Sequence, residues 1–135
     1  MKNLLSISLL FVLFISSCKK TETVTPPFDL SGTSWTGTSN VPGLSLSDKP
    51  FKLMFHDDGT LTGSFTNSGT DFALNGTWNL RPNATTVHIY FTLASVSGSY
   101  IGQATLTTNN TKLESGYANN ATTPSANLVF TVTKS

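Results

Sequence analysis

The side chains in this sequence that could do acid-base or metal chemistry are two histidines and an aspartate pair. His56 stands directly before Asp57 and Asp58, and the second histidine is His88. Imidazole and carboxylate groups transfer protons or ligate metals when they converge. Both histidines fall opposite the phenylalanine positions of their stretches, however, and an Asp-Asp-Gly run is typical of a hairpin turn. Since no hydrolase, zinc-protease or phosphate-loop motif occurs, we expect no catalytic residue, no metal, no cofactor and no enzyme activity.

The only cysteine, Cys18, ends an apolar stretch near the start of the chain. Lys2, the apolar run from residue 4 to 15 and two serines form the three-part layout of a secretory signal. The run is shorter than the roughly 20 apolar residues that a membrane-spanning helix needs. A single cysteine excludes an intrachain disulfide, and no histidine lies nearby for a metal site or a nucleophile. We predict a signal peptide over residues 1–17. The alternative is an ordinary cleaved signal in which Cys18 has no role.

Ser16 and Ser17 before Cys18 resemble the lipobox of bacterial lipoproteins, with Ile15 where leucine is usual. In that family the cysteine becomes the first mature residue, with a diacylglycerol on its sulfur and usually an acyl chain on its amine. The resemblance implies a membrane partner, held through the lipids on Cys18, and labelling by palmitate. Two acyl chains anchor a protein stably where one would not. No aspartate follows the cysteine, which implies the outer membrane of the cell envelope, at its periplasmic face or the cell surface.

The rest of the chain divides into a short polar segment and one domain. Residues 18–27 read CKKTETVTPP, which cannot bury a core and predicts a flexible tether. Residues 28–135 have the length of a single domain. Without Lys2, seven Lys and Arg balance seven Asp and Glu. A nucleic-acid binder needs a basic stripe, so we expect no nucleic-acid partner.

Apolar residues of the domain recur with a period of two, which indicates strands. In the stretch from Phe51, alternate residues are apolar, and Asp57-Asp58-Gly59 ends it in a turn. Eight such strands joined by short loops predict an all-β fold, an antiparallel up-and-down barrel, with a β-sandwich as the alternative. The expected strands are one around Trp35 and those near residues 51–56, 60–66, 71–80, 86–93, 100–106, 111–117 and 127–134.

Several short motifs in this domain resemble known barrels. They are Leu-Ser-Gly-Thr-Ser-Trp at 30–35, Phe-x-Leu-x-Phe running into Asp-Asp-Gly-Thr at 51–60, and Gly-Thr-Trp at 76–78. Together they resemble the lipocalin-like domains of small bacterial lipoproteins. Lipocalins pack a basic residue of the last strand across a tryptophan of the first, which implies Trp35 and Lys134 as an end plug. The opening and the run DGTLTGSF also resemble avidins, but Phe65 lacks the tyrosine hydroxyl that meets biotin there, so biotin is not expected.

The aromatic residues of the barrel interior are the candidate ligand-binding set. An eight-stranded barrel either fills with side chains or holds one small ligand. A ligand would be a small apolar molecule at the mouth, helped by the hydroxyls of Tyr100 or Tyr117. We therefore keep two hypotheses: a lipid-anchored protein that binds a small hydrophobic ligand, or a filled barrel that meets a protein partner through loops 39–48 and 116–125. The set comprises Phe51, Phe55, Phe65, Phe72, Trp78, Phe91, Tyr100 and Phe130.

Overall fold

The structure is a computed structural model that describes residues 28–80, 84–94, 96–107 and 109–135. The expected signal peptide, Cys18 and the tether up to residue 27 lie outside these described residues. In the described part, no helix has the length and apolar character that crossing a membrane requires.

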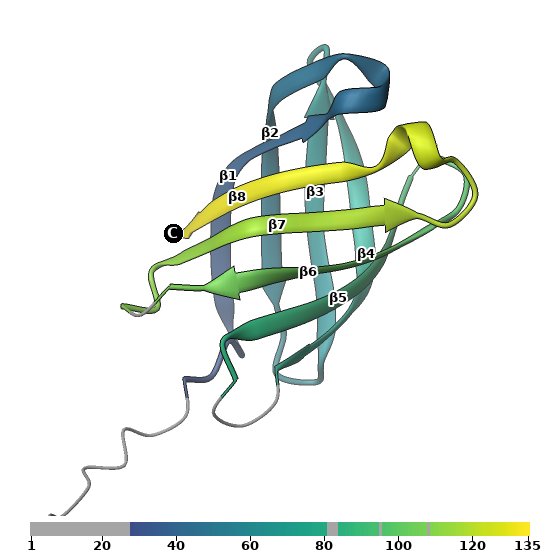
Figure 1. Cartoon of the computed structure of the whole chain (residues 1–135). Coiled ribbons are helices and arrows are strands. Elements are labelled where there is room, and N and C mark those ends of the chain that lie inside the picture. Colours follow the sequence, from purple (N-terminus) through teal and green to yellow (C-terminus); the bar gives the residue numbers. More distant parts are fainter. Residues whose placement is uncertain (1–27, 81–83, 95, 108) are drawn as a thin grey trace, which may run out of the picture.

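The described chain folds into eight antiparallel strands, each paired with its neighbours in sequence, and β1 pairs with β8 to close a barrel. This confirms the predicted up-and-down barrel and replaces the sandwich alternative. Figure 1 shows β5 to β8 crossing in front of the steeper strands β1 to β4. The strands are β1 (Thr33–Val41), β2 (Leu46–Phe55), β3 (Thr60–Asn67), β4 (Thr70–Leu80), β5 (Thr86–Leu93), β6 (Ser99–Leu106), β7 (Lys112–Asn120) and β8 (Leu128–Lys134).

Alternation along the strands decides which side chains enter the barrel. In β5, Val87, Ile89 and Phe91 are buried, whereas the intervening His88 and Tyr90 are exposed. Successive side chains of a strand point to opposite faces of the sheet, so a period of two gives one apolar inner face. The sequence pattern therefore fixes which face of each strand points inward.

Two tight turns place β2, β3 and β4 next to one another. Gly59 has φ of +80° and donates its N–H to the carbonyl of His56, as expected for the Asp-Asp-Gly run. Between β3 and β4, Ser68 and Gly69 both have positive φ, and Asn67 pairs with Thr70. A two-residue hairpin turn with positive φ at both central positions matches the twist of the flanking strands.

Both segments expected as long loops are shorter because the strands extend into them. Val41 pairs with Leu46, so the β1–β2 connection contains only the 3₁₀ helix η2 (Pro42–Leu44) and Ser45. The side chain of Asn40 accepts the backbone N–H of Asp48 at 2.8 Å. In the second segment, β7 runs to Asn120, and the loop that follows contains the 3₁₀ helix η3 (Pro124–Ala126).

These two loops meet at one end of the barrel. A Cβ on Gly43 of η2 would lie 2.4 Å from the carbonyl oxygen of Ser125 in η3, so the backbones touch there. Asn120 is buried beneath the second loop, where its side-chain oxygen accepts the N–H groups of Thr122 and Thr123 at 2.9 and 2.7 Å. Its amide also donates to the carbonyl of Ser97 at 3.1 Å. A buried side chain with all these bonds fixes the loop at this end of the barrel.

Aromatic side chains close the other end. Phe55 lies edge-on to Trp35 and to Trp78, with ring centroids 6.4 and 5.4 Å apart. Leu30, just before β1, is fully buried as part of the core. The indole N–H of Trp78 donates to the carbonyl of His56 at 3.1 Å, which ties the group to the β2–β3 turn.

Candidate functional site

The structure places the predicted aromatic set on the inner side of the barrel. Six of its eight members are at most 6% exposed, and the other two, Phe72 and Trp78, are partly buried and packed against the core. Phe51 contacts Phe130 at 5.2 Å between ring centroids, and Phe91 stacks on Tyr100 at 4.9 Å. Whether this set binds a ligand stays a prediction.

Burial at this level indicates that side chains occupy the interior. A cavity large enough for a ligand would leave the residues around it accessible to a water-sized probe. Instead, Trp35, Phe51, Phe55 and Phe91 are each 0% exposed. Buried aromatic pairs in offset or edge-on contact also stabilise a core beyond their area alone. The geometry thus favours the filled-barrel alternative for the described interior.

The predicted end-plug residues, Trp35 and Lys134, are direct cross-strand partners where β1 pairs with β8. Trp35 donates its indole N–H to the hydroxyl of Thr33 at 2.8 Å. The ammonium group of Lys134 lies over the ring of Phe28, 5.4 Å from the centroid. The cation–π contact of Lys134 is therefore with Phe28, which sequence reasoning did not single out.

His56 and Asp58 of the β2–β3 turn form local hydrogen bonds. Asp58 accepts the backbone N–H of Thr60 at 2.9 Å and its hydroxyl at 2.6 Å. These hydrogen bonds, the hydroxyl first, hold the pKa of the Asp58 carboxyl below its ordinary value, and the charge of His56 adds a smaller effect. The ring of His56 meets the hydroxyl of Thr62 at 2.7 Å. Among the described residues, no three His, Cys, Asp or Glu side chains gather to hold a metal ion.

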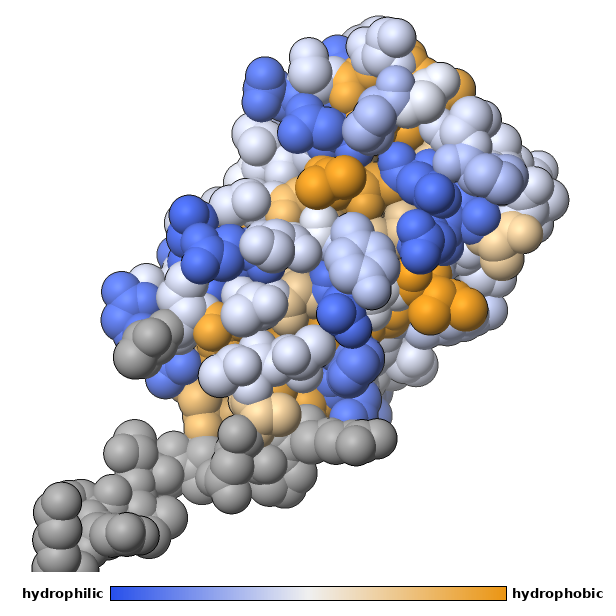
Figure 2. Space-filling view, viewed as in Figure 1, coloured by the Kyte–Doolittle hydropathy of each residue, from blue (hydrophilic) through white to orange (hydrophobic). Residues whose placement is uncertain are grey.

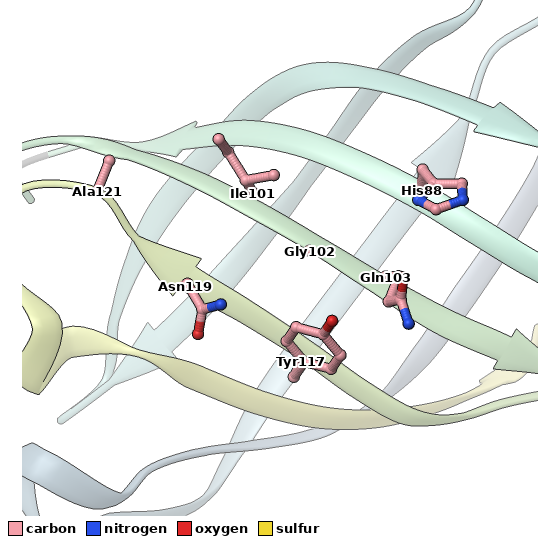
Figure 3. Close-up of a pocket in the computed structure, with 7 residues that line it drawn as sticks. All are labelled: His88, Ile101, Gly102, Gln103, Tyr117, Asn119 and Ala121. Carbon is pink, nitrogen blue, oxygen red and sulfur yellow. The ribbon is translucent and has the colours of Figure 1, made fainter.

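The outer face of β5 to β7 carries an open hollow of about 360 Å³. Figure 3 shows His88, Ile101, Gln103, Tyr117 and Asn119 arranged around the side-chain-free Gly102. Ala121, beyond the end of β7, completes the lining.

A second hollow of about 230 Å³ adjoins the first on the β4 side. The two share His88, Ile101 and Gly102, so they are adjacent, and we call the two hollows together the outer groove. Tyr90 lines the second hollow and Tyr117 the first. The second hollow is also lined by Thr77, Trp78, Asn79 and Ile89.

Strand register brings the groove residues into two parallel rows. In one row, His88 on β5 pairs with Gln103 on β6, and Gln103 pairs with Tyr117 on β7. The adjacent row runs from Tyr90 through Ile101 to Asn119. Directly opposed residues share a face and lie within contact distance of one another. Each row therefore combines a tyrosine with a hydrogen-bonding amide.

This face also holds most of the large apolar side chains that solvent reaches. Tyr90, Ile101, Tyr117 and Val129 are 46%, 59%, 42% and 44% exposed, and all four lie on β5 to β8. Figure 2, in the same view as Figure 1, shows orange hydrophobic residues set among blue and pale polar ones on the front of the molecule. A contiguous exposed apolar patch rimmed by polar residues is typical of an interaction site.

Sequence reasoning missed the outer groove. It placed the Tyr117 hydroxyl at the barrel mouth, whereas Tyr117 points outward from β7. A signal was present: Tyr90, Ile101 and Tyr117 occupy strand positions that should be polar if that face were only solvated. The register that gathers them was not readable, because it joins residues of three strands.

Comparisons with known proteins gave no match from which a family or a function could be assigned. The chain matches no family model, and searches of curated proteins and of solved structures found no significant match. The closed eight-stranded antiparallel barrel is consistent with a lipocalin-like fold.

Proposed function

We propose that this protein is a lipid-anchored, non-enzymatic lipoprotein of the bacterial outer membrane, related to lipocalin-like lipoproteins, whose barrel is an interaction module. The observation that carries the proposal is the contrast between the two faces of the sheet. Inward-facing aromatics such as Phe91 are fully buried, while Tyr90 beside it on β5 is 46% exposed at a groove. A filled barrel with a hollowed, partly apolar exterior supports binding on the outside.

The residue that would carry the lipid anchor is Cys18, which follows an apolar segment and two small residues. Two acyl chains at this position would hold the barrel at the membrane, with residues 18–27 as the tether. Metabolic labelling with a palmitate analogue should tag the wild-type chain and leave Cys18→Ala untagged. Equal labelling of the two chains would remove the lipoprotein part of the proposal.

The binding part is tested by photo-crosslinking in the intact cell envelope. A benzophenone amino acid at position 117 inserts into any C–H bond of a partner that covers the groove. The same amino acid at position 54 is the matched control, since Met54 is an outward residue of β2 with 43% exposure. We expect adducts from position 117 and none from position 54. Adducts from neither position, or equally from both, would contradict binding at this face.

The second candidate function is the binding of a small hydrophobic ligand on the inner side of the barrel. Leu46, Phe72 and Val96 are partly buried hydrophobics packed against the core. All three lie at the barrel end that carries η2 and η3, because β2 and β4 begin there and residue 96 belongs to the β5–β6 loop. For a ligand at this mouth, Phe65→Trp and Phe91→Trp would lower affinity by filling its space, whereas Tyr117→Ala would not.

A further inference from the structure

We infer that the outer groove binds an uncharged saccharide. The inference deepens the proposed function and rests on it, since it names the chemistry of the partner that the exposed face meets. It follows from four properties of the groove: tyrosine faces, amide groups beside them, the lack of formal charge, and size.

Tyrosine supplies the apolar platforms. Tyr90 and Tyr117 are about half exposed and line the smaller and the larger hollow respectively, with Ile101 between them on β6. A sugar ring has one face of C–H bonds that packs flat against an aromatic ring. Tyr combines a large apolar surface, a polar tip and only two side-chain torsions, so little conformational entropy is lost on binding.

Amide and imidazole groups supply the hydrogen bonds. Gln103 and Asn119 line the larger hollow, and His88 lines both. Each amide offers acceptors on its oxygen and two donors on its nitrogen, which matches a hydroxyl that both donates and accepts. Gln103 and Tyr117 are direct cross-strand partners, so an amide lies beside an aromatic platform. This alternation fits a ligand with hydroxyls along its edge.

The uncharged lining of the groove favours a neutral saccharide over acidic or basic partners. The residues that line the two hollows include no Asp, Glu, Lys or Arg in the part of the chain that the structure describes. The charged pair nearest in sequence on β7, Lys112 and Glu114, is joined in a salt bridge of 3.2 Å. A groove without formal charge gives no electrostatic gain to an ionic ligand and imposes no cost on a neutral one.

Size favours a short oligosaccharide over a protein surface. The larger hollow, about 360 Å³, falls in the range of about 300 to 1,000 Å³ that is usual for small-molecule sites. The smaller hollow extends it across β5 toward β4. A depression that crosses several strands suits consecutive rings of one chain.

The test is a titration of the full chain with defined oligosaccharides. The protein is extracted in a polyoxyethylene detergent, so that no detergent headgroup is itself a sugar. The neutral probes are cellotetraose, maltotetraose and tetra-N-acetylchitotetraose, and tetragalacturonate is the acidic control. Binding is measured by calorimetry at two salt concentrations that differ tenfold.

We expect at least one neutral probe to bind, with an affinity that the change in salt leaves unaltered and with tighter binding than tetragalacturonate. Tyr117→Ala and Tyr90→Ala should each weaken it about tenfold, as truncation of an aromatic anchor commonly does. Gln103→Ala should weaken it less. Met54→Ala, the matched outward control, should bind as the wild type does. Thermal unfolding of each variant verifies that the barrel is intact.

Three results would overturn the inference. They are the absence of binding to every neutral probe, a preference for the acidic probe, and full binding by the folded Tyr90→Ala, Tyr117→Ala double variant. The first of these results, together with dimers that Tyr117→Ala converts to monomers, would show that the groove is a self-association surface instead. Crosslinks from position 117 together with no saccharide binding would leave the proposed interaction module standing and remove only the saccharide.

Discussion

The inside and outside of the sheet formed by β5 to β8 carry similar side chains with opposite surroundings. Inside, Phe91 stacks on Tyr100 with parallel rings, and both are at most 2% exposed. Outside, Tyr90 and Tyr117 lie on the same strands as buried neighbours yet remain about half exposed at the outer groove. The difference teaches that aromatic content alone does not locate a binding site in a small barrel. The face to which each residue points decides between core and site.

The comparison is sharpest between adjacent residues of β5. Phe91→Ala should lower the free energy of unfolding by about 3 to 5 kcal/mol, because it removes a fully buried ring and leaves a cavity. Tyr90→Ala should change it by less than about 0.5 kcal/mol, as exposed substitutions usually do. Urea unfolding of the two variants measures both values. Similar losses from the two substitutions would mean that the outer face is a part of the core.

A second pair of adjacent residues, Asn119 and Asn120 at the end of β7, tests the same contrast between inward and outward positions with polar side chains. Asn120→Ala should cost about 1 to 3 kcal/mol of unfolding free energy, because it unpairs the N–H groups of Thr122 and Thr123 and the carbonyl of Ser97. Asn119→Ala, on the outward side, is the control and should be nearly neutral. Urea unfolding again gives the values, and a neutral Asn120→Ala would show that the loop with η3 is held by other contacts.

A smaller loss of unfolding free energy is expected at the end of the barrel that contains Trp35, where the core meets solvent. Lys134→Gln removes the cation over Phe28 and should cost about 0.5 to 1 kcal/mol. Lys52→Gln, an exposed position on β2, is the matched control for the lost charge. Chemical unfolding at low and high salt measures the difference. Equal effects of the two substitutions would indicate that net charge, and not the aromatic contact, is responsible.

The smallest change in stability is expected in the exposed β2–β3 turn. The pKa of Asp58 is lowered by its hydrogen bonds to Thr60, so its ionised form is favoured in the folded state. Its stabilisation is therefore fully present above the ordinary carboxyl pKa of about 3.9 and is lost as the pH falls through the lowered folded pKa. The stability difference between wild type and Asp58→Asn should shrink over that acidic range. A difference that is constant with pH would contradict this role.

The fold was predictable because its pattern is local. Alternating residues such as Val87, Ile89 and Phe91 specify an inner face, and the glycine after Asp58 specifies a turn. Loop lengths were less predictable. Asn40 and Asp48 lie in the segment 39–48 that we expected as a loop, but their hydrogen bond lies within the extended β1–β2 pairing.

The candidate site was less predictable than the fold because it depends on register across strands. Ile101 and Tyr117 are separated in sequence, and only the pairing of β6 with β7 places them beside the same hollow. A one-residue shift in register would move a strand's whole outward set inward. Alternation thus predicts which residues face outward but not which of them meet.

The central claim is that the barrel interior is filled and that binding belongs to the outer face. Native mass spectrometry of the full chain, purified from its own host and compared with the denatured chain, tests it directly. The account predicts that no apolar molecule accompanies the native chain, whose acyl chains are covalent additions that the denatured chain retains. One apolar molecule per chain in the native spectrum, retained in Tyr117→Ala and lost in Phe91→Trp, would contradict it.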